Sequence, residues 1–430
     1  MTSPARSWRM VAAISASALA LAACGGGDDD VDVATPDATD APATSTAEGD
    51  GTLTIGSLLP QTGNLAFLGP PEFAGVELAI EEINEGGGVL DNDVAYLEGD
   101  SGDTQQDVAN PTVDRLLAAD VDVIIGAASS GVSFTVIDKI TSAGVVHYSP
   151  ANTSPDFTDY DDNGLYFRTA PSDVLQGRIL GETILADGCT NVGVLALQDP
   201  YGEGLAENVG LAVTENGGSL TPENPIFYDP AASNFDAQVN ELKAANPGCA
   251  VLIGFEESAK VIQSMVAAGI GPQQLPLYLV DGNLGNALGE DLPAGLLEGT
   301  KGSLPGAEAT SDFRDRLLTI DSALTDFSYA AESYDAVITS ALAAVAAGSD
   351  AGEAIAAELP GVTKDGEKCT TFADCVALLE DDQDIDYDGI SGPIELSDVG
   401  DPTEAVVGIY TYGPDNKLTA DVVYQPGSLE

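Results

Sequence analysis

Short hydrogen-bonding side chains gather at the end of an apolar segment, in the stretch "HYSPANTSP" at residues 147–155. Pro150 and Pro155 fix backbone angles on both sides of this group, so the Thr153 hydroxyl has little conformational entropy left to lose. A hydroxyl can donate and accept hydrogen bonds, and backbone N–H and C=O groups lie beside it. The loop therefore suits a small ligand that carries both charges. The alternative is an Asx or Ser/Thr turn that only closes the loop.

Further polar residues follow other apolar segments. The stretch "AASSG" at residues 127–131 opens a helix, so Ser129 or Ser130 would lie where free N–H groups and the helix dipole favour an anion. An ordinary serine N-cap is the alternative. Asp281 ends the segment "PLYLV" and could be the counterion of an ammonium group, or simply a loop carboxylate. Tyr201 and Phe255 could line the same site or belong to the core.

Strands and amphipathic helices that alternate along the chain would position these residues. We expect strands at 52–60, 94–100, 121–126, 145–149, 191–197, 250–255 and 276–281, and helices at 72–88, 132–144, 174–187, 204–216, 234–245 and 257–268. Two such runs predict an α/β fold of two Rossmann-like lobes, with parallel sheets flanked by helices. Ligands bind beyond the carboxyl ends of strands in such sheets, which is where the polar residues above lie. The tail predicts a β-hairpin around Gly413–Asn416.

The composition is strongly acidic. The 430 residues are 44% hydrophobic and contain 14 Lys and Arg against 70 Asp and Glu, a net charge of −56. Such a surface repels nucleic acid and anionic lipid, so neither is expected as a direct partner. We interpret the charge as a solvated, self-repelling surface of an acidic protein.

The N-terminus has the pattern of an export signal. Arg6 and Arg9 precede an Ala-rich apolar run that is too short for a membrane span, which predicts a signal peptide at 1–23. The stretch "LAAC" resembles a bacterial lipobox, in which the cysteine, here Cys24, is lipid-modified and begins the mature chain. A plain signal peptide is the alternative. Residues 24–51 then predict a disordered acidic tether, because they lack aromatic and basic residues.

Export also predicts disulfides among the remaining cysteines. Cys189 and Cys249 each precede an apolar strand, whereas Cys369 and Cys375 would close a small local loop. Three pairings are possible, and we favour 189–249 with 369–375. A zinc site is disfavoured because the cysteine spacings do not pair as C-x-x-C and His147 is the single histidine.

The residues do not predict an enzyme. No G-x-S-x-G surrounds a serine, and we expect His147 to cap a strand beside the cleft, where it would tune affinity weakly with pH. No cofactor is expected, with calcium as the alternative. The segment 384–395 has the EF-hand spacing, although Pro393 argues against an exiting helix; its candidate ligands are Asp384, Asp386, Asp388 and Glu395.

Taken together, the motifs resemble the leucine/isoleucine/valine-binding family of periplasmic solute-binding proteins, which feed ABC importers. The matching stretches span residues 52–413 and include "IGSLLPQTGNLAFLG", "DVIIGAASSG", "YSPANTSPDFT", "YFRTAPSDVLQG", "DPYGEGLAENV" and "YDGISGPIEL". The resemblance implies the type I periplasmic binding protein fold, with a hinge of several crossovers. It implies one lobe from residues 52–170 plus about 303–388, and a second lobe from 171–302 plus about 389–430.

The resemblance also implies roles for individual residues. Ser130 and the Thr153 N–H would hold the α-carboxylate of an amino acid, and the Ala151 carbonyl and the Thr153 hydroxyl would accept from its ammonium. Asp281 stands where the family usually has glutamate, as the ammonium's counterion, and Tyr201 would close the cleft from the second lobe. Leu68 replaces a position that is often aromatic. The apolar pocket would be completed by Leu68, Ala128, Ser129 and Phe255.

The expected function is therefore that of an extracytoplasmic lipoprotein that binds a small neutral amino acid, branched-chain or otherwise aliphatic. Its expected partners are the permease and ATPase subunits of an importer, with a lipid anchor in the membrane, and we expect a monomer. Binding of urea, short amides or another small metabolite is the alternative, as is a ligand sensor of the same fold.

Overall fold

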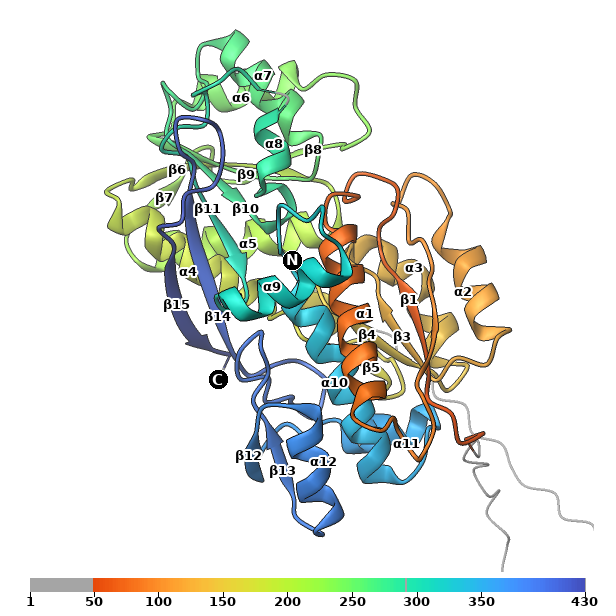
Figure 1. Cartoon of the computed structure of the whole chain (residues 1–430). Helices are drawn as coiled ribbons and strands as arrows, with labels where there is room; N and C mark the ends of the chain where they lie inside the picture. The colour runs from red at the N-terminus through yellow and green to blue at the C-terminus, as the bar shows by residue number, and fades with distance from the viewer. Residues whose placement is uncertain (1–48, 291, 430) are drawn as a thin grey trace, which may run out of the picture. The chain divides into compact units, whose positions relative to one another are not determined.

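Two sheets, each flanked by helices, organise the chain, and they confirm the predicted α/β class (Figure 1). The computed structural model describes residues 49–290 and 292–429, which belong to one unit, Ser45–Glu430. The strands are β1 (Thr54–Leu58), β2 (Ala95–Leu97), β3 (Val123–Gly126), β4 (Val146–Ser149), β5 (Tyr166–Arg168), β6 (Asn191–Leu197), β7 (Ser219–Leu220), β8 (Ile226–Tyr228), β9 (Cys249–Ile253), β10 (Leu277–Val280), β11 (Lys301–Pro305), β12 (Glu367–Cys369), β13 (Ile385–Tyr387), β14 (Glu404–Thr411) and β15 (Val423–Ser428).

The helices follow the strands in the expected alternation. They are α1 (Gly69–Glu85), α2 (Ala109–Leu117), α3 (Ser130–Thr141), α4 (Asp173–Ala186), α5 (Pro200–Glu215), α6 (Asp236–Ala245), α7 (Ser258–Ala268), α8 (Asn286–Glu290), α9 (Ser311–Ile320), α10 (Ala330–Ala347), α11 (Gly352–Glu358) and α12 (Phe372–Glu380). Most predicted boundaries fall within a few residues of these. Helix α5 begins before the predicted start because Asp199 caps it, with its carboxylate accepting from the Tyr201 N–H.

The first sheet is parallel, in the order β2-β1-β3-β4-β5. Successive residues of a strand point to opposite faces, so Ile124 and Ile125 of β3 enter different cores. Ile125 packs in the core that contains α1 and α10, which lie side by side in Figure 1, and Ile124 packs with α2 and α3. Buried strands with both faces covered need the continuous apolar runs that the sequence shows.

The second sheet has the order β15-β14-β11-β10-β9-β6-β7, with β8 also paired to β6. Its central strands are parallel, whereas β14 runs antiparallel to β11 and β15 antiparallel to β14. The predicted C-terminal hairpin is thus present. Its connection is longer than a tight turn, although the Asn416 N–H does donate to the Gly413 carbonyl at 3.1 Å.

The Asn110-Pro111 pair, for which the sequence pattern offers no reason, lies in the first turn of α2. Proline is tolerated there because the first N–H groups of a helix have no acceptor within the helix. The proline therefore marks the start of a helix and does not interrupt one.

Three segments connect the elements of the two sheets, at residues 169–172, 306–310 and 388–403. Arg168, the last residue of β5 directly before the first segment, joins it to the third through a buried ion pair in which its Nε lies 2.6 Å from Asp401 Oδ1. The second and third are joined by a 3.1 Å hydrogen bond from the Ala307 N–H to the Ser391 carbonyl. These bonded crossings are the natural position for a hinge, although the lobe boundaries stay a prediction.

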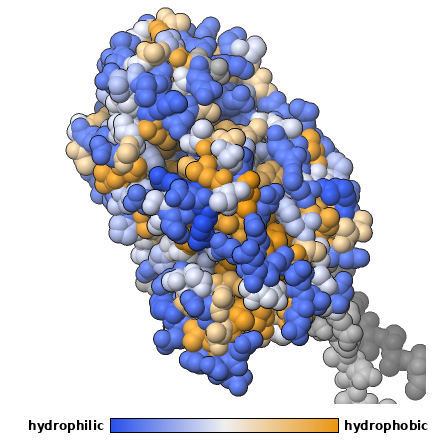
Figure 2. Space-filling view, viewed as in Figure 1, coloured by the Kyte–Doolittle hydropathy of each residue, from blue (hydrophilic) through white to orange (hydrophobic). Residues whose placement is uncertain are grey.

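Both favoured disulfides are present, Cys189–Cys249 and Cys369–Cys375. The predicted signal peptide, Cys24 and most of the tether lie outside the described residues. Within the described ranges, no helix has the length and hydropathy needed to cross a bilayer. Figure 2 shows that one face of the molecule is largely hydrophilic, with hydrophobic residues in local patches, as the excess of acidic side chains predicts.

Candidate functional site

A small buried cavity of about 10 Å³ brings most of the predicted site residues together. It lies beyond the carboxyl ends of β3, β4, β9 and β10 and beside the first turn of α5, as expected for a site in parallel sheets. Of the predicted residues, all but Thr153 line it: Leu68, Ala128, Ser129, Ser130, Ala151, Tyr201, Phe255 and Asp281. Leu65, Gly282 and Tyr329 complete the lining.

The "SPANTSP" loop owes its shape to two of its polar side chains. The Ser149 hydroxyl donates to the Ala127 carbonyl at 2.7 Å, and Asn152 Nδ2 donates to the carbonyls of Ala127 and Ala128 at 2.9 Å. These bonds fasten the loop to the β3–α3 connection, so the turn interpretation holds for Ser149 and Asn152. Thr153 differs, because its buried hydroxyl has no hydrogen-bond partner of good geometry among the described residues.

The two serines of "AASSG" have separate places at the start of α3. Ser129 is the N-cap, and its hydroxyl accepts from the Val132 N–H at 3.4 Å. Ser130 is the first helical residue and lines the cavity, with its hydroxyl accepting from the Ser154 N–H at 3.4 Å. The positive end of the α3 dipole therefore faces the cavity through Ser130.

Asp281 is buried at the opposite side of the cavity, directly after β10. Its Oδ1 accepts from Gln176 Nε2 at 2.7 Å and from the Tyr201 hydroxyl at 2.8 Å, and its Oδ2 accepts from the Tyr329 hydroxyl at 2.8 Å. Burial raises the pKa of Asp281, and these three donors oppose the shift by stabilising the carboxylate. The cluster holds a buried carboxylate with no cationic side chain hydrogen-bonded to it.

Apolar side chains form the remaining walls. The rings of Tyr201 and Phe255 are stacked, 5.6 Å apart and 9° from parallel, and Leu65 and Leu68 belong to the same core cluster. This arrangement places an apolar surface between Ser130 and Asp281. It matches the apolar pocket expected from the sequence. The ring of Tyr201 forms part of the apolar wall, and its hydroxyl donates to Asp281.

Three polar residues of this region were absent from the predicted site: Gln176, Tyr329 and Asp173. Gln176 and Asp173 lie in the stretch "YFRTAPSDVLQG", which already carried the family resemblance, so their position was a usable signal. Tyr329 has none, because it precedes α10 and adopts a positive φ of 59°, which is uncommon for an aromatic residue. Its hydroxyl reaches Asp281 from 48 residues away.

The expectations for His147 are wrong. The residue lies within β4 and not at its end, and its ring is buried and edge-on to Tyr166 at 5.3 Å. Burial lowers the pKa of His147 to about 3, against a smaller opposite effect of the Gly126 backbone. The imidazole is then neutral across the physiological range, so it cannot tune affinity there.

The calcium spacing is not accompanied by an assembled set of ligands. Lys368 Nζ lies 2.9 Å from a carboxylate oxygen of Asp386 and 2.9 Å from one of Asp388. Two of the four candidate calcium ligands are therefore in ion pairs with a lysine. Among residues 49–290 and 292–429, no group of three or more His, Cys, Asp or Glu side chains could hold a metal ion. The segment instead forms β13 and the turn that follows it.

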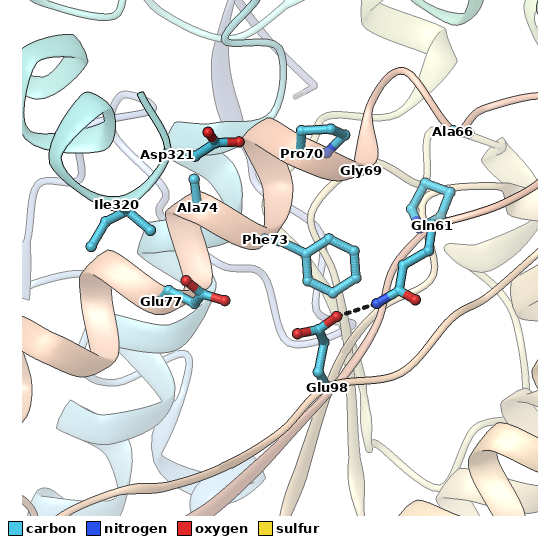
Figure 3. A pocket seen from close by; sticks show the side chains of 11 residues that line it. Gln61, Ala66, Gly69, Pro70, Phe73, Ala74, Glu77, Glu98, Ile320 and Asp321 are labelled. Atoms are coloured by element: carbon cyan, nitrogen blue, oxygen red, sulfur yellow. Dashed lines mark hydrogen bonds between the residues drawn. The ribbon is translucent and has the colours of Figure 1, made fainter. Parts of the chain in front are cut away.

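A wider hollow of about 470 Å³ lies beside α1 and contains none of the predicted site residues (Figure 3). Glu77, Glu98 and Asp321 surround the ring of Phe73, and Gln61 donates to Glu98. Burial raises the pKa of Glu77, with smaller contributions from Glu98 and Asp321. We assign no binding role to this open acidic hollow.

Comparison with known proteins identifies the family to which the chain belongs. The periplasmic binding protein family profile matches residues 52–376. Leu/Ile/Val-binding protein homolog 1 of Brucella abortus (strain 2308) is 30% identical over 314 residues, which cover 69% of this chain and 79% of that protein. The chain belongs to the periplasmic binding protein family, in its Leu/Ile/Val-binding branch. This is a family of binding proteins and not of enzymes, which confirms both the resemblance and the non-enzymatic prediction.

Other periplasmic binding proteins agree with this assignment. Leu/Ile/Val-binding protein homolog 3 of Brucella melitensis is 27% identical over 241 residues, which cover 54% of this chain and 64% of that protein, slightly under two thirds. The leucine-binding protein LivK of Thermotoga maritima MSB8 has a TM-score of 0.71 at 20% identity, covering 87% of this chain and 98% of its own. LivJ of Streptococcus pneumoniae, solved with isoleucine, has a TM-score of 0.70 at 21% identity, covering 87% and 100%. At these identities the two structures support the fold alone.

Proposed function

We propose that this periplasmic binding protein captures a small neutral aliphatic amino acid in the cavity between Ser130 and Asp281. The main support is that the N-terminus of α3 and the buried carboxylate of Asp281, to which no cationic side chain is hydrogen-bonded, face one cavity with apolar walls. The first suits the α-carboxylate and the second the α-ammonium, because a zwitterion is costly to desolvate unless each charge finds partners. The name of a relative that is 30% identical, Leu/Ile/Val-binding protein homolog 1, agrees with this ligand class.

The roles of individual residues follow from this orientation. Ser130 and the Thr153 N–H would bind the carboxylate, and Asp281, the Ala151 carbonyl and the Thr153 hydroxyl would bind the ammonium. The aliphatic side chain would lie against Leu68, Ala128, Ser129 and Phe255. Tyr201 and Tyr329 orient Asp281 and favour its ionised form against the effect of burial, since each donates a hydroxyl hydrogen bond to one of its oxygens.

Ligand entry requires the facing elements to separate. A cavity of about 10 Å³ has room for roughly one water molecule, far less than an aliphatic amino acid needs. The hydrogen bonds between the proposed lobes that would have to open near the cavity include the Tyr329 hydroxyl to Asp281 Oδ2 at 2.8 Å, Ser154 Oγ to the Pro200 carbonyl at 3.3 Å, and the Glu256 N–H to the Asn64 carbonyl at 3.3 Å. A ligand with partners on both sides stabilises the closed state by differential affinity, and the three bonded crossings would act as the hinge.

We propose in addition that the protein acts outside the cytoplasm and delivers its ligand to the permease and ATPase of an ABC importer. Family membership supports this proposal, and the N-terminal sequence pattern supports export with a lipid anchor at Cys24. The two disulfides fit an oxidising compartment.

The test is a thermal-shift screen of the purified protein against the neutral amino acids, urea and acetamide, followed by calorimetric titration. A ligand at about a hundred times its Kd adds about 2.7 kcal/mol to the stability of the native state. We expect the largest shift with leucine, isoleucine or valine, and at least a ~30-fold weaker Kd for Asp281→Asn, because the ammonium loses its counterion. Asp114→Asn, which changes a surface carboxylate, is the control and should bind like the wild type. A response to urea or acetamide alone would contradict the amino-acid assignment.

A further inference from the structure

The buried polar atoms near Asp281 that lack a hydrogen-bond partner are all acceptors. Among the described residues, those without a hydrogen bond of good geometry are Asp173 Oδ1 and Oδ2, Gln176 Oε1 and Thr153 Oγ1. The Thr153 hydroxyl does lie close enough to Asp173 to lower the pKa of its carboxyl, and its oxygen can still accept. Carboxylate and amide oxygens can only accept, and a hydroxyl oxygen can accept as well as donate. A buried acceptor without a donor is costly, so this excess of acceptors indicates a ligand that brings several donors to the site.

Asp173 is placed in this region by its own backbone and by its helix. It is the first residue of α4, after the N-cap Ser172, and its N–H donates to the Thr153 carbonyl at 2.7 Å. Gln176, three residues later on the same helix face, donates to Asp281. On the other side, a Cβ added at Gly204 would lie 3.7 Å from Asp173 Oδ2, so the carboxylate lies against the first turn of α5, which also carries Tyr201.

Among the described residues, no cationic side chain is hydrogen-bonded to Asp173. The groups that face it are Asp281, Asp199, Tyr201, the Thr153 hydroxyl and Arg168, and the guanidinium of Arg168 already binds Asp401 at 2.6 and 2.9 Å. Burial raises the pKa of Asp173 well above its usual range, and Asp281 adds to the shift, whereas Thr153 and Arg168 oppose it. Asp173 is fully buried.

We propose that Asp173 is a second carboxylate of the ammonium site and that, with Thr153, it makes the protein specific for a primary ammonium. The inference rests on the proposed amino-acid function and deepens it. A primary ammonium has three N–H donors, which Asp281, the Thr153 hydroxyl and Asp173, in place of the Ala151 carbonyl, can accept together. The N-methylated analogue keeps the positive charge but has two N–H donors, and the hydroxy analogue has one donor and no charge, so each leaves at least one buried acceptor unpaired.

The test compares L-leucine with its 2-hydroxy analogue, 2-hydroxy-4-methylpentanoate, and with N-methyl-L-leucine by calorimetric titration. The wild type should prefer L-leucine over each by about 100-fold or more. Asp173→Asn keeps the shape of the side chain but removes its charge, so it should weaken L-leucine by about 10- to 100-fold and change the hydroxy acid by less than about 3-fold. The preference for the ammonium would then largely disappear.

Glu72→Gln is the matched control. Glu72 is also fully buried with both oxygens unpartnered, but the charged group that it faces is Glu332, between α1 and α10, whereas Asp173 faces Asp281. Both variants replace a buried carboxyl group whose oxygens lack hydrogen-bond partners, so both should fold and keep or raise the thermal midpoint without ligand. Glu72→Gln should leave the ratio of leucine to hydroxy-acid affinity unchanged.

The outcomes separate this inference from the proposed function. A wild-type protein that binds no amino acid refutes both. A wild type that binds L-leucine, together with an Asp173→Asn variant that binds it equally well, overturns the inference alone. Equal losses for L-leucine and the hydroxy acid would assign Asp173 a structural role and would overturn it too.

Discussion

Replacing Asp401 with asparagine leaves the Arg168 guanidinium buried without its counterion. Arg168 has no exposed side-chain surface, and it joins three parts of the chain. Its Nε and one terminal nitrogen bind Asp401 at 2.6 and 2.9 Å, and the other terminal nitrogen donates to the Ser154 carbonyl at 2.8 Å. An uncompensated buried charge costs about 3–5 kcal/mol.

That cost translates into a measurable shift of the thermal midpoint. With an unfolding entropy of about 2.1 cal/mol/K per residue, roughly 380 folded residues give about 0.8 kcal/mol/K. Asp401→Asn should therefore lower the midpoint by about 4–6 °C in differential scanning calorimetry. Because Arg168 also holds the loop that carries Thr153, the variant should bind the amino acid more weakly as well.

The surface pair Lys139–Asp114 provides the matched control. Its charged atoms are also 2.8 Å apart, but its side chains are 33% and 66% exposed. Solvent screens such a pair, so Asp114→Asn should cost about 1 kcal/mol or less, a shift near 1 °C. If Asp401→Asn shifts the midpoint no more than Asp114→Asn, burial does not govern the strength of the Arg168 pair and the reasoning fails.

Three further predictions concern the disulfides, Tyr329 and Glu332. In urea unfolding, double alanine substitution of Cys189–Cys249 should lower the free energy of unfolding by about 4 kcal/mol, and that of Cys369–Cys375 by about 2 kcal/mol. The costs differ because the closed loops differ in length, 60 against 6 residues. Equal costs would contradict the chain-entropy argument. Tyr329→Phe should weaken amino-acid binding by about 10- to 100-fold in calorimetric titration, because Asp281 loses a hydrogen-bond donor. The control is Tyr424→Phe, on the outer strand β15, which should bind like the wild type. Burial raises the pKa of Glu332 from 4.5 to about 8, so the stability of the wild type should fall as pH rises between these values. In thermal midpoints measured against pH, Glu332→Gln should lose the part of this decrease that Glu332 causes. An unchanged pH dependence would refute the prediction.

The sequence alone was sufficient for the alternation of strands and helices, the disulfide pairs and most of the cavity residues. Apolar periodicity reports burial locally, and polar residues after strands fall at one edge of a parallel sheet whatever the details of packing. This is why Ser130 and Asp281 could be named from their places after strands, whereas Ala151 was named from the family resemblance. The flanking prolines favoured Thr153 within its loop, but no local pattern showed that the Ser149 hydroxyl would bond to the Ala127 carbonyl.

Only the tertiary structure decided which polar groups keep their hydrogen-bonding capacity for a ligand. The Ser149 hydroxyl donates a hydrogen bond to a carbonyl of the neighbouring loop, whereas the side chains of Thr153 and Asp173 are buried without a hydrogen bond of good geometry. Tyr329 reaches Asp281 through a left-handed backbone conformation and a contact across 48 residues, and His147 is neutral because it is enclosed. Pairing and desolvation depend on neighbours brought together from distant parts of the chain, so no local pattern encodes them.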